Sequence, residues 1–504
     1  MGRHRKEIRT HFNQSGVLVM KIYLLNPPFV ENFVRCGRWQ GVTARGGTLD
    51  YPKWLAYTTA ALEQDGHTVK LRDAVASKFS LGDVLKEIFA FHPEVLVIET
   101  NFSSLTNDIN VLNEIRQSLK WGTVNIVTGP PTATYPERIL DNEPVDIVAR
   151  FEYDFVVRDL VAGISKGEDL SLVRGIWYKK DNLIVKNPER SFSSQDDLDN
   201  LPFIAKVYND HLNIFDYYLS QSLYPVVQIF SGRGCPFKCS FCSWPENLMG
   251  RSIRLRSVEN LVSEFKFVTE KLPFVKEIFI EDDTFTLNKE RVREFCRSKI
   301  GNNLNIRWSC NARADLDFET MKLMKKAGCR LVIVGYESGS EAILKSIHKG
   351  VIIKRAKEFT KDAKRAGLLV HGDFIIGLPG ETHETAMQTL NYIKEIRPDV
   401  LQVAVATPIP GTEFYNYVRD NGYLQVSDMK ESIDENGYQR CIISYPQFTH
   451  SDIENWVNRI LKEYYLSPTY FVTFVQGTLR GGGVEHVKSV MRAGKSFIRY
   501  ILKY

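Results

Sequence analysis

The segment PVVQIFSGRGCPFKCSFCSWP (225–245) runs from a short apolar strand directly into three closely spaced cysteines. The spacing is Cys235-x3-Cys239-x2-Cys242, which places three of the chain's eight cysteines within eight residues. By chance alone such a spacing has a probability of about 0.002 at this cysteine frequency. Three thiolates can hold three irons of a [4Fe–4S] cluster and leave the fourth iron open. The segment therefore predicts an iron–sulfur site at the end of a strand.

A structural zinc site and an unligated coincidence are the two alternatives for this group of cysteines. Zinc needs a fourth Cys or His, and the nearest histidines in the sequence are His211 and His348. The other cysteines stand singly and are most simply small buried residues. They are Cys36, Cys296, Cys310, Cys329 and Cys441.

The strand before the cysteines opens an alternation of strands and helices that continues to about residue 425. Six βα units of this kind predict a partial (β/α)6 barrel, whose functional groups lie at the carboxyl ends of the strands. The predicted strands are PVVQIFS (225–231), VKEIFIEDD (275–283), IRWSCNA (306–312), RLVIVGYES (330–338), LVHGDFIIG (369–377) and VLQVAVATP (400–408).

A separate alternation of strands and helices precedes the barrel and predicts an open parallel α/β sheet. Ligands of such sheets lie beyond the carboxyl ends of the strands, which here are small or polar. Neither GxGxxG nor GxxxxGK[ST] follows any strand, so dinucleotide and P-loop sites are disfavoured. The predicted strands are KIYLLNPP (21–28), HTVKLRDA (67–74), PEVLVIETN (93–101), VNIVTGPP (124–131) and VDIVARFE (145–152).

Length and composition agree with a globular protein of about three domains. The 504 residues are 43% hydrophobic and 25% charged, which excludes a disordered chain or a disulfide scaffold. No apolar run of about 18 residues and no secretory signal is present, so we expect a cytoplasmic protein. The net charge is only +5 and is concentrated in residues 1–9 and 484–504, so the near-neutral body argues against nucleic acid as a partner.

The cysteine segment resembles the Cx3CxΦC signature of the radical SAM superfamily, with Phe241 as the aromatic residue. The resemblance implies that Cys235, Cys239 and Cys242 ligate the cluster and that S-adenosylmethionine (SAM) chelates the open iron. An electron from a reductant such as flavodoxin or ferredoxin then cleaves SAM to methionine and a 5′-deoxyadenosyl radical. That radical abstracts a hydrogen atom from the substrate, inside a barrel that excludes water.

Other strand ends carry the segments that contact SAM in similar enzymes. Arg313 suits a carboxylate because its fork is bidentate, and Glu337 suits a ribose hydroxyl or an ammonium group. Taken singly, each carboxylate also fits a helix cap or a surface ion pair, whereas the set at successive strand ends favours a ligand site. The resemblance assigns SAM binding to Phe241, Glu281, Asp282, Asp283, Asn311, Arg313, Glu337, Gly377 and Pro379.

An open sheet with LLNPP at its first strand, fused before such a barrel, is similar to a Rossmann-like cobalamin-binding domain. The Asp-x-His-x-x-Gly motif that supplies an axial histidine elsewhere is absent, and the nearest string, from Asp65 to Lys70, lacks the final glycine. The resemblance therefore implies cobalamin without a histidine ligand, either as a working cofactor or as an inherited fold. It assigns cobalamin contacts to Asn26, Pro27, Pro28, Thr100, Asn101, Thr128 and Gly129.

Further segments resemble the hopanoid-biosynthesis radical SAM family, of the bacteriohopanetetrol cyclitol ether synthase type. This resemblance implies remodelling of a lipid-linked polyol or sugar headgroup through an unactivated C–H bond. Cobalamin-dependent C-methylation and oxidative cyclisation, as in the Mg-protoporphyrin ester cyclase, remain alternatives. The segments are YPKWLAY (51–57), CSWPENLMGRSIRLRSVEN (242–260), EIFIEDDTFT (277–286), RWSCNARADLDFETMKLMKKAG (307–328), LVIVGYESGS (331–340) and HGDFIIGLPGET (371–382).

These features divide the chain into four parts, with the start of translation at either Met1 or Met20 left open. The last 21 residues predict a basic amphipathic helix, which either packs on the protein's own core or lies on a membrane surface. The parts are a cobalamin-type domain (15–165), a connector (166–223), a radical SAM barrel (224–425) and a helical C-terminal region (426–504).

Overall fold

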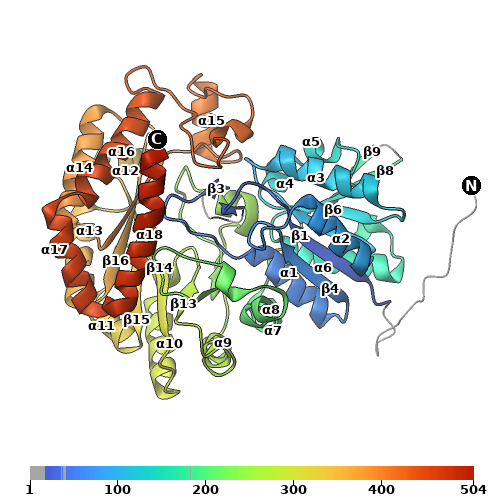
Figure 1. Ribbon diagram of the computed structural model, residues 1–504, viewed down its shortest axis with the longest axis horizontal. Coiled ribbons are helices and arrows are strands. Elements are labelled where there is room, and N and C mark those ends of the chain that lie inside the picture. The colour runs from blue at the N-terminus through green and yellow to red at the C-terminus, as the bar shows by residue number, and fades with distance from the viewer. Residues whose placement is uncertain (1–17, 36, 38–40, 182, 504) are drawn as a thin grey trace, which may run out of the picture.

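The computed structural model describes residues 18–35, 37, 41–181 and 183–503, and it contains two parallel α/β units side by side (Figure 1). The predicted basic segment 1–9, Cys36 and the first residues of the predicted N-terminal domain lie outside the described residues. The N-terminal unit and the barrel are the two halves of Figure 1, and the C-terminal helices lie on the barrel side. The α/β architecture predicted from the sequence is confirmed.

The N-terminal unit is a seven-stranded sheet in the order β4-β1-β5-β6-β7-β8-β9, and its first five strands are parallel. Its central strands are rich in β-branched residues because helices cover both faces, as in open parallel sheets generally. The strands are β1 (Lys21–Asn26), β4 (Thr68–Asp73), β5 (Val95–Glu99), β6 (Val124–Thr128), β7 (Ile147–Ala149), β8 (Ile176–Lys180) and β9 (Leu183–Lys186). The helices are α1 (Lys53–Gln64), α2 (Leu81–Phe91), α3 (Leu105–Ser118), α4 (Pro131–Thr134), α5 (Pro136–Leu140) and α6 (Tyr153–Lys166).

The hairpin β8–β9 belongs to this sheet, although the sequence analysis assigned its residues to the connector 166–223. β8 pairs antiparallel with β7, with Ala149 opposite Ile176. This pairing covers the edge of β7 that would otherwise expose unpaired backbone groups. The rest of the predicted connector forms η1 (Leu170–Leu172), α7 (Gln195–Asn200), α8 (Ile204–His211) and η2 (Ile214–Asp216).

The barrel is an open parallel sheet of six strands in sequential order, as the sequence predicted. Buried apolar side chains from several of its strands, such as Val226, Phe279 and Leu331, pack together in one cluster. Its strands are β10 (Val226–Ile229), β13 (Glu277–Ile280), β14 (Arg307–Ala312), β15 (Cys329–Glu337), β16 (Leu369–Ile376) and β17 (Val400–Val405). Its helices are α9 (Val258–Lys271), α10 (Lys289–Gly301), α11 (Phe318–Lys326), α12 (Glu341–Ser346), α13 (Ile353–Arg365) and α14 (His383–Ile396).

The region after the barrel begins as loops with one short helical turn, η5 (Met429–Ser432), and becomes mainly helical from His450 onward. Isolated antiparallel bridges, such as that between Leu424 and Ile443, hold the loops together. The remaining elements are α15 (Glu413–Asp420), η5 (Met429–Ser432), α16 (His450–Tyr465), α17 (Pro468–Gly477), η6 (Thr478–Gly482) and α18 (Gly483–Lys503). Among the described residues, no helix has the length and apolar character needed to cross a membrane.

One continuous hydrophobic core joins the N-terminal unit to the barrel. Trp54 and Tyr57 on α1 pack against Phe230 at the end of β10, with ring centroids 5.6 and 5.7 Å apart. Tyr51 stacks between Tyr208 and Tyr217 of the connector at 4.0 Å from each ring. The two units are therefore packed as one body, and the carboxyl edge of the first sheet lies close to the first barrel strand.

Candidate active site

The three cysteines of the predicted cluster lie on one loop between β11 (Gly232–Arg233) and η3 (Pro245–Met249). All three are half-buried, and the Cys242 amide donates to the Cys239 carbonyl at 3.1 Å in a tight turn. Within the described residues, no three His, Cys, Asp or Glu side chains converge as ligands of a single metal ion. An iron–sulfur cluster does not require such convergence, because each thiolate binds its own iron and the three sulfurs need not meet at one point.

Two glycines in front of the cysteines allow this loop to turn at the end of the strand. Gly234 has a φ of +89°, and a Cβ there would lie 2.0 Å from the Ser252 carbonyl oxygen. A Cβ on Gly232 would lie 2.5 Å from Leu255 on β12 (Arg254–Leu255), the strand that pairs with β11. A side chain at position 234 would therefore displace backbone beside the cysteine loop, whereas one at position 232 would first displace the Leu255 side chain.

Asp282 anchors the start of the cysteine loop from the neighbouring strand end. Its carboxylate accepts hydrogen bonds from the Ser231 amide (2.6 Å), the Ser231 hydroxyl (2.5 Å) and the Gly232 amide (3.0 Å). Burial raises the pKa of Asp282, and these donors and Arg291 act in the opposite direction. The structure thus places Asp282, which the sequence analysis assigned to SAM, against the backbone that carries the cysteines.

Arg233 joins the cysteine loop to the N-terminal unit through a buried ion-pair network. Its guanidinium lies 2.6 Å from Asp154 and 3.1 Å from Glu152, and it stacks on Trp54 with 4.8 Å to the ring centroid. Arg254 of β12 also reaches Glu152, at 2.7 Å. Burial alone would raise the pKa of Glu152, but Arg233 and Arg254 hold it below its usual value. Sequence reasoning missed this network, because the partners lie about 80 residues apart.

Arg313 and Glu337 lie at the ends of β14 and β15, as predicted, and Lys349 joins them. The Lys349 ammonium donates to Glu337 at 2.6 Å. Burial would lower the pKa of Lys349, but Glu337 and Cys239 raise it, while Arg313 opposes. This ammonium therefore stays charged in a half-buried position, where Cys239 of the cysteine loop and Arg313 both affect its pKa. Lys349 follows the short helix α12, and no local motif marks it in the sequence.

The Arg313 guanidinium covers a ring of the cysteine loop. Its Cζ lies 3.6 Å from the centroid of Phe237, and its own amide donates to Thr286 at 3.2 Å. Asn311, two residues before it, donates to the Asp282 carbonyl at 2.9 Å. The third strand end is thus held against both the loop and the second strand end.

The remaining predicted SAM residues divide between the second and fifth strand ends. Glu281 is buried and accepts from the Gln228 amide at 3.0 Å, whereas Asp283 is half-buried. Gly377 has a φ of +101°, and a Cβ there would lie 2.9 Å from Ile453 on α16. Pro379 is half-buried in the loop that follows. The C-terminal region therefore packs directly on the loop after β16.

A cavity of about 40 Å³ opens between the cysteine loop and the carboxyl ends of β16 and β17. Phe241 of the cysteine loop lines it together with Asp373 and Gln402. Beside Asp373, His371 is 4% exposed, and neither of its ring nitrogens has a hydrogen-bond partner within the described part of the chain. Its Nε2 lies 3.2 Å from Asp373 Oδ1. Sequence reasoning did not single out this pair, because both residues stand inside an otherwise apolar strand.

The predicted cobalamin residues gather at the carboxyl edge of the N-terminal sheet, where they hold the loop after β1. Asn101 accepts from the Gly41 amide at 3.0 Å and donates to the Arg35 carbonyl at 2.7 Å. Asn26 accepts from Arg35 at 2.7 Å, and Thr100 donates to Asp108, which pairs with Arg35 at 2.6 Å.

The other predicted cobalamin residues also make contacts within the protein at this edge. Thr128 donates to the Ala149 carbonyl at 3.3 Å. Gly129 has a φ of +108°, and a Cβ there would lie 2.2 Å from the Thr100 carbonyl oxygen. Pro27 accepts from Arg35 through its carbonyl. Pro28 accepts from Asn107 at 3.1 Å in the same way.

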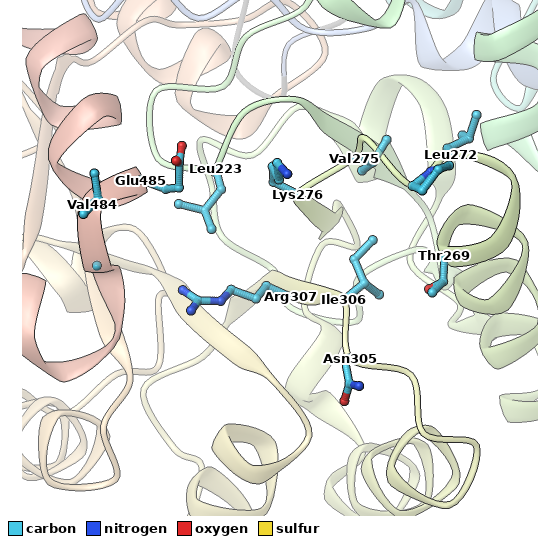
Figure 2. A pocket seen from close by; sticks show the side chains of 12 residues that line it. Leu223, Thr269, Leu272, Val275, Lys276, Asn305, Ile306, Arg307, Val484 and Glu485 are labelled. Carbon is cyan, nitrogen blue, oxygen red and sulfur yellow. The ribbon is translucent and has the colours of Figure 1, made fainter.

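A larger cavity of about 420 Å³ lies elsewhere, at the amino ends of β13 and β14 and the start of α18 (Figure 2). Leu272, Val275 and Ile306 give it an apolar wall, and Lys276 and Arg307 supply cations. It is at the opposite ends of the strands from the cysteine loop, so it is separate from the candidate active site.

Comparisons with known proteins show the family of this chain. Residues 229–393 match the Radical SAM superfamily. An uncharacterized methyltransferase of Pyrococcus horikoshii is 30% identical over 90% of this chain and 94% of its own length. The chain therefore belongs to the radical SAM superfamily and is an enzyme that uses a [4Fe–4S] cluster and SAM. The Hopanoid C-3 methylase of Methylococcus capsulatus is 25% identical over 72% of this chain and 68% of its own length.

The fold has a solved counterpart. The radical S-adenosylmethionine methyltransferase TsrM from Kitasatospora setae, solved with cobalamin and a [4Fe–4S] cluster, superposes with a TM-score of 0.68. The two chains are 17% identical, and 90% of each is covered. The order of an open α/β domain before a partial barrel is therefore shared with that protein.

Proposed function

We propose that this chain is a cobalamin-dependent radical SAM enzyme that functionalises an unactivated C–H bond of a lipid-linked polyol or sugar. The observation that carries the proposal is the attachment of the cysteine loop to the N-terminal sheet. Arg233, two residues before Cys235, is ion-paired to Asp154 at the start of α6. Since the amino end of α6 adjoins the carboxyl edge of that sheet, a cluster on the loop and a ligand on the edge would be neighbours.

Three side chains at the barrel mouth suit the polar groups of SAM. Arg313 and Lys349 provide two cations for its carboxylate, and Glu337 provides an acceptor for its ammonium or ribose hydroxyls. When bound, the cluster supplies the electron that cleaves SAM to begin radical chemistry. The aromatic rings of Phe237 and Phe241 would exclude water from that end of the barrel.

The carboxyl edge of the N-terminal sheet fits cobalamin through two unsatisfied polar atoms. Glu99 Oε2 at the end of β5 and Trp54 Nε1 near the start of α1 are buried without hydrogen-bond partners among the described residues. Buried polar atoms without partners require an explanation. The peripheral amides of cobalamin can donate to Glu99 Oε2 and accept from Trp54 Nε1. When bound, cobalamin supplies carbon–cobalt chemistry.

No histidine is positioned as an axial ligand at that edge among the described residues. The string from Asp65 to His67 lies at the opposite, amino edge, where His67 Nδ1 accepts from the Met20 amide at 3.3 Å. We therefore propose that cobalamin is held without imidazole. Because the side chains of Asn26, Thr100 and Asn101 hold the covering loop, contacts to cobalamin would fall to the backbone of that loop and of the strand ends.

C-methylation is the second candidate, and the relatives named as methyltransferases favour it as much as headgroup remodelling. The two reactions differ in their products. A methylation consumes one SAM as methyl donor and another for the radical, so S-adenosylhomocysteine and 5′-deoxyadenosine both accumulate. A rearrangement or cyclisation needs no methyl donor and yields 5′-deoxyadenosine without stoichiometric S-adenosylhomocysteine.

A lipid substrate is supported by the resemblance to hopanoid enzymes and by the hopanoid methylase among the relatives. We further propose that the enzyme works in the cytoplasm with a one-electron donor of the flavodoxin or ferredoxin class. We place residues 484–504 at a membrane surface. Their exposed Met491 side chain and interleaved basic residues support that placement.

Spectroscopy of the anaerobically reconstituted protein tests the proposal. We expect a [4Fe–4S] signal and about one equivalent of bound hydroxocobalamin. Electron paramagnetic resonance of the Co(II) form should show no splitting from a histidine nitrogen. Absence of the cluster signal would overturn the enzyme assignment, and failure to bind cobalamin would leave the radical SAM assignment alone.

A further inference from the structure

Exposed apolar side chains concentrate on the last helices of the protein. Among the described residues, thirteen large apolar side chains are exposed, and seven of them fall between residues 466 and 491. A monomeric protein scatters such side chains, so a concentration of this kind marks an interaction surface. The seven, which we call the C-terminal apolar face, are Leu466, Phe471, Val472, Val475, Leu479, Val484 and Met491.

Three of the seven side chains, Phe471, Val472 and Val475, lie on α17, which the sequence analysis did not single out. Phe471 and Val475 on α17 and Leu479 on η6, the turn that follows α17 directly, are spaced four residues apart, so they follow one side of this helical segment. Phe471 is 68% and Leu479 is 82% exposed, whereas Thr473 and Gly477 are buried on the inner side. α17 stands on the side of the barrel farthest from the N-terminal unit (Figure 1). The outward stripe therefore covers nothing else in the described chain.

The outward direction of the stripe is set by firm attachment of the α17–α18 junction to the barrel. Arg480 pairs with the buried Asp399, and Arg307 donates to the Gly481 carbonyl at 2.9 Å. Farther along, the Ser489 hydroxyl donates to the Ser222 carbonyl at 3.0 Å. One side of α18 thus packs on the protein's own core, which was one of the two alternatives for this helix. Val484 and Met491 on this helix stay exposed, at 71% and 69%.

The charge around the C-terminal apolar face is basic. Residues 464–484 contain no acidic residue, and residues 464–504 carry six Lys or Arg and one Glu. Lys488 and Lys495 are exposed on α18. Val484 lines the 420 Å³ cavity, which combines an apolar wall with two cations, Lys276 and Arg307, and one carboxylate, Glu485 (Figure 2). An apolar stripe with surrounding cations is complementary to a bilayer with anionic headgroups.

We propose that the C-terminal apolar face, led by α17, binds the surface of an anionic lipid bilayer. The apolar side chains enter the boundary of headgroups and acyl chains, while the lysines of α18 lie over the anionic headgroups. This inference rests on the proposed function in taking a lipid as substrate, because the docked enzyme would meet that lipid where it is dissolved. It extends the surface from residues 484–504 to α17.

Vesicle binding of the full-length, cluster-loaded protein tests this surface. The double variant Phe471→Ser/Leu479→Ser should lower the partition coefficient onto phosphatidylcholine–phosphatidylglycerol vesicles by about tenfold or more. Leu172→Ser/Leu183→Ser is the matched control, since these side chains are 74% and 71% exposed on the N-terminal unit. The control should bind as the parent does. Equal binding by parent and α17 variant, or equal loss in both double variants, would overturn the proposal.

Charge and self-association provide two further readouts. Replacing Lys488 and Lys495 by Gln should weaken binding by about fivefold per charge at low salt and have no effect on vesicles of phosphatidylcholine alone. Light scattering tests whether a second copy covers the face: a parent dimer that the α17 variant converts to monomer would overturn the bilayer assignment. SAM cleavage without substrate should be unchanged in the α17 variant, so loss of docking is distinguishable from failure of the proposed chemistry.

Discussion

Replacement of Asp282 by alanine separates an anchor of the cysteine loop from a ligand of SAM. The carboxylate accepts three hydrogen bonds, from the amide and hydroxyl of Ser231 and from the amide of Gly232. Asp282→Ala would leave these donors unsatisfied at a buried position. Each orphaned buried donor costs about 1–3 kcal/mol. The variant should therefore lose roughly 3 kcal/mol or more of the free energy of unfolding, a large share of a typical total.

Urea denaturation of the protein, together with iron and sulfide analysis, measures both consequences of this change. We expect a lower denaturation midpoint and a lower iron content per chain, because the strand end that carries Cys235 loses its attachment. Asp282→Asn keeps an acceptor oxygen and should fall between the parent and Asp282→Ala. Asp315→Ala is a control on the same side of the barrel, since the Asp315 side chain is 54% exposed. Its effect should be within about 0.5 kcal/mol.

The opposite outcome is equally measurable. If Asp282 contacts SAM instead of anchoring the loop, Asp282→Ala should keep a full cluster and an unchanged midpoint while SAM binds more weakly. That result would refute the anchoring argument. It would also restore the assignment made from the sequence alone.

Three further changes test the rest of the site. Cys239→Ala should abolish formation of 5′-deoxyadenosine by removing one of three thiolates, whereas Cys441→Ala should not; product formation by the first variant would show the ligand assignment to be wrong. Lys349→Met should raise the KM for SAM about tenfold or more because it removes the ammonium that pairs with Glu337, and Lys349→Arg should restore part of it; an unchanged KM would remove Lys349 from the site. Burial raises the pKa of Glu99 to about 7. The stability that the neutral Glu99 carboxyl contributes is therefore fully present below the pKa of Glu99 in the unfolded chain, and it is lost as the pH rises through 7. Glu99→Gln should then become more stable than the parent by up to about 3 kcal/mol at pH 8 but not at pH 5, and urea denaturation showing a constant difference would contradict this.

The fold was largely predictable because the strands of both α/β units have the same recognisable sequence pattern. Each barrel strand is a short β-branched run that ends in a polar or glycine-containing loop, and six such runs in sequence leave few alternatives to a partial barrel. The hairpin β8–β9 was not placed by that logic. Its residues alternate in polarity like any hairpin, and only the exposed edge of β7 decides which sheet it extends.

The site was predictable in its residue types and less so in their roles. Arg313 and Glu337 follow apolar strands, so their position at the barrel mouth could be inferred from the sequence. Whether a carboxylate there faces a ligand or the protein's own backbone depends on what the neighbouring strand brings within 3 Å, as the bonds of Asp282 illustrate. The sequence did not mark Lys349 as a site residue, because its partner Glu337 lies twelve residues earlier, on the other side of the short helix α12.

By itself, the sequence determined the chemistry that this protein can attempt. Thiol spacing in Cys235-x3-Cys239-x2-Cys242 is a local property of the chain, and so is the periodicity of each strand and helix. Only the tertiary structure decided which groups meet. The pairing of Arg233 with Asp154, the covering of Asn101 by its loop and the outward stripe of α17 all join segments distant in sequence or depend on which helix face is left uncovered. Their partners are selected by packing and desolvation in three dimensions, which no local pattern of residues records.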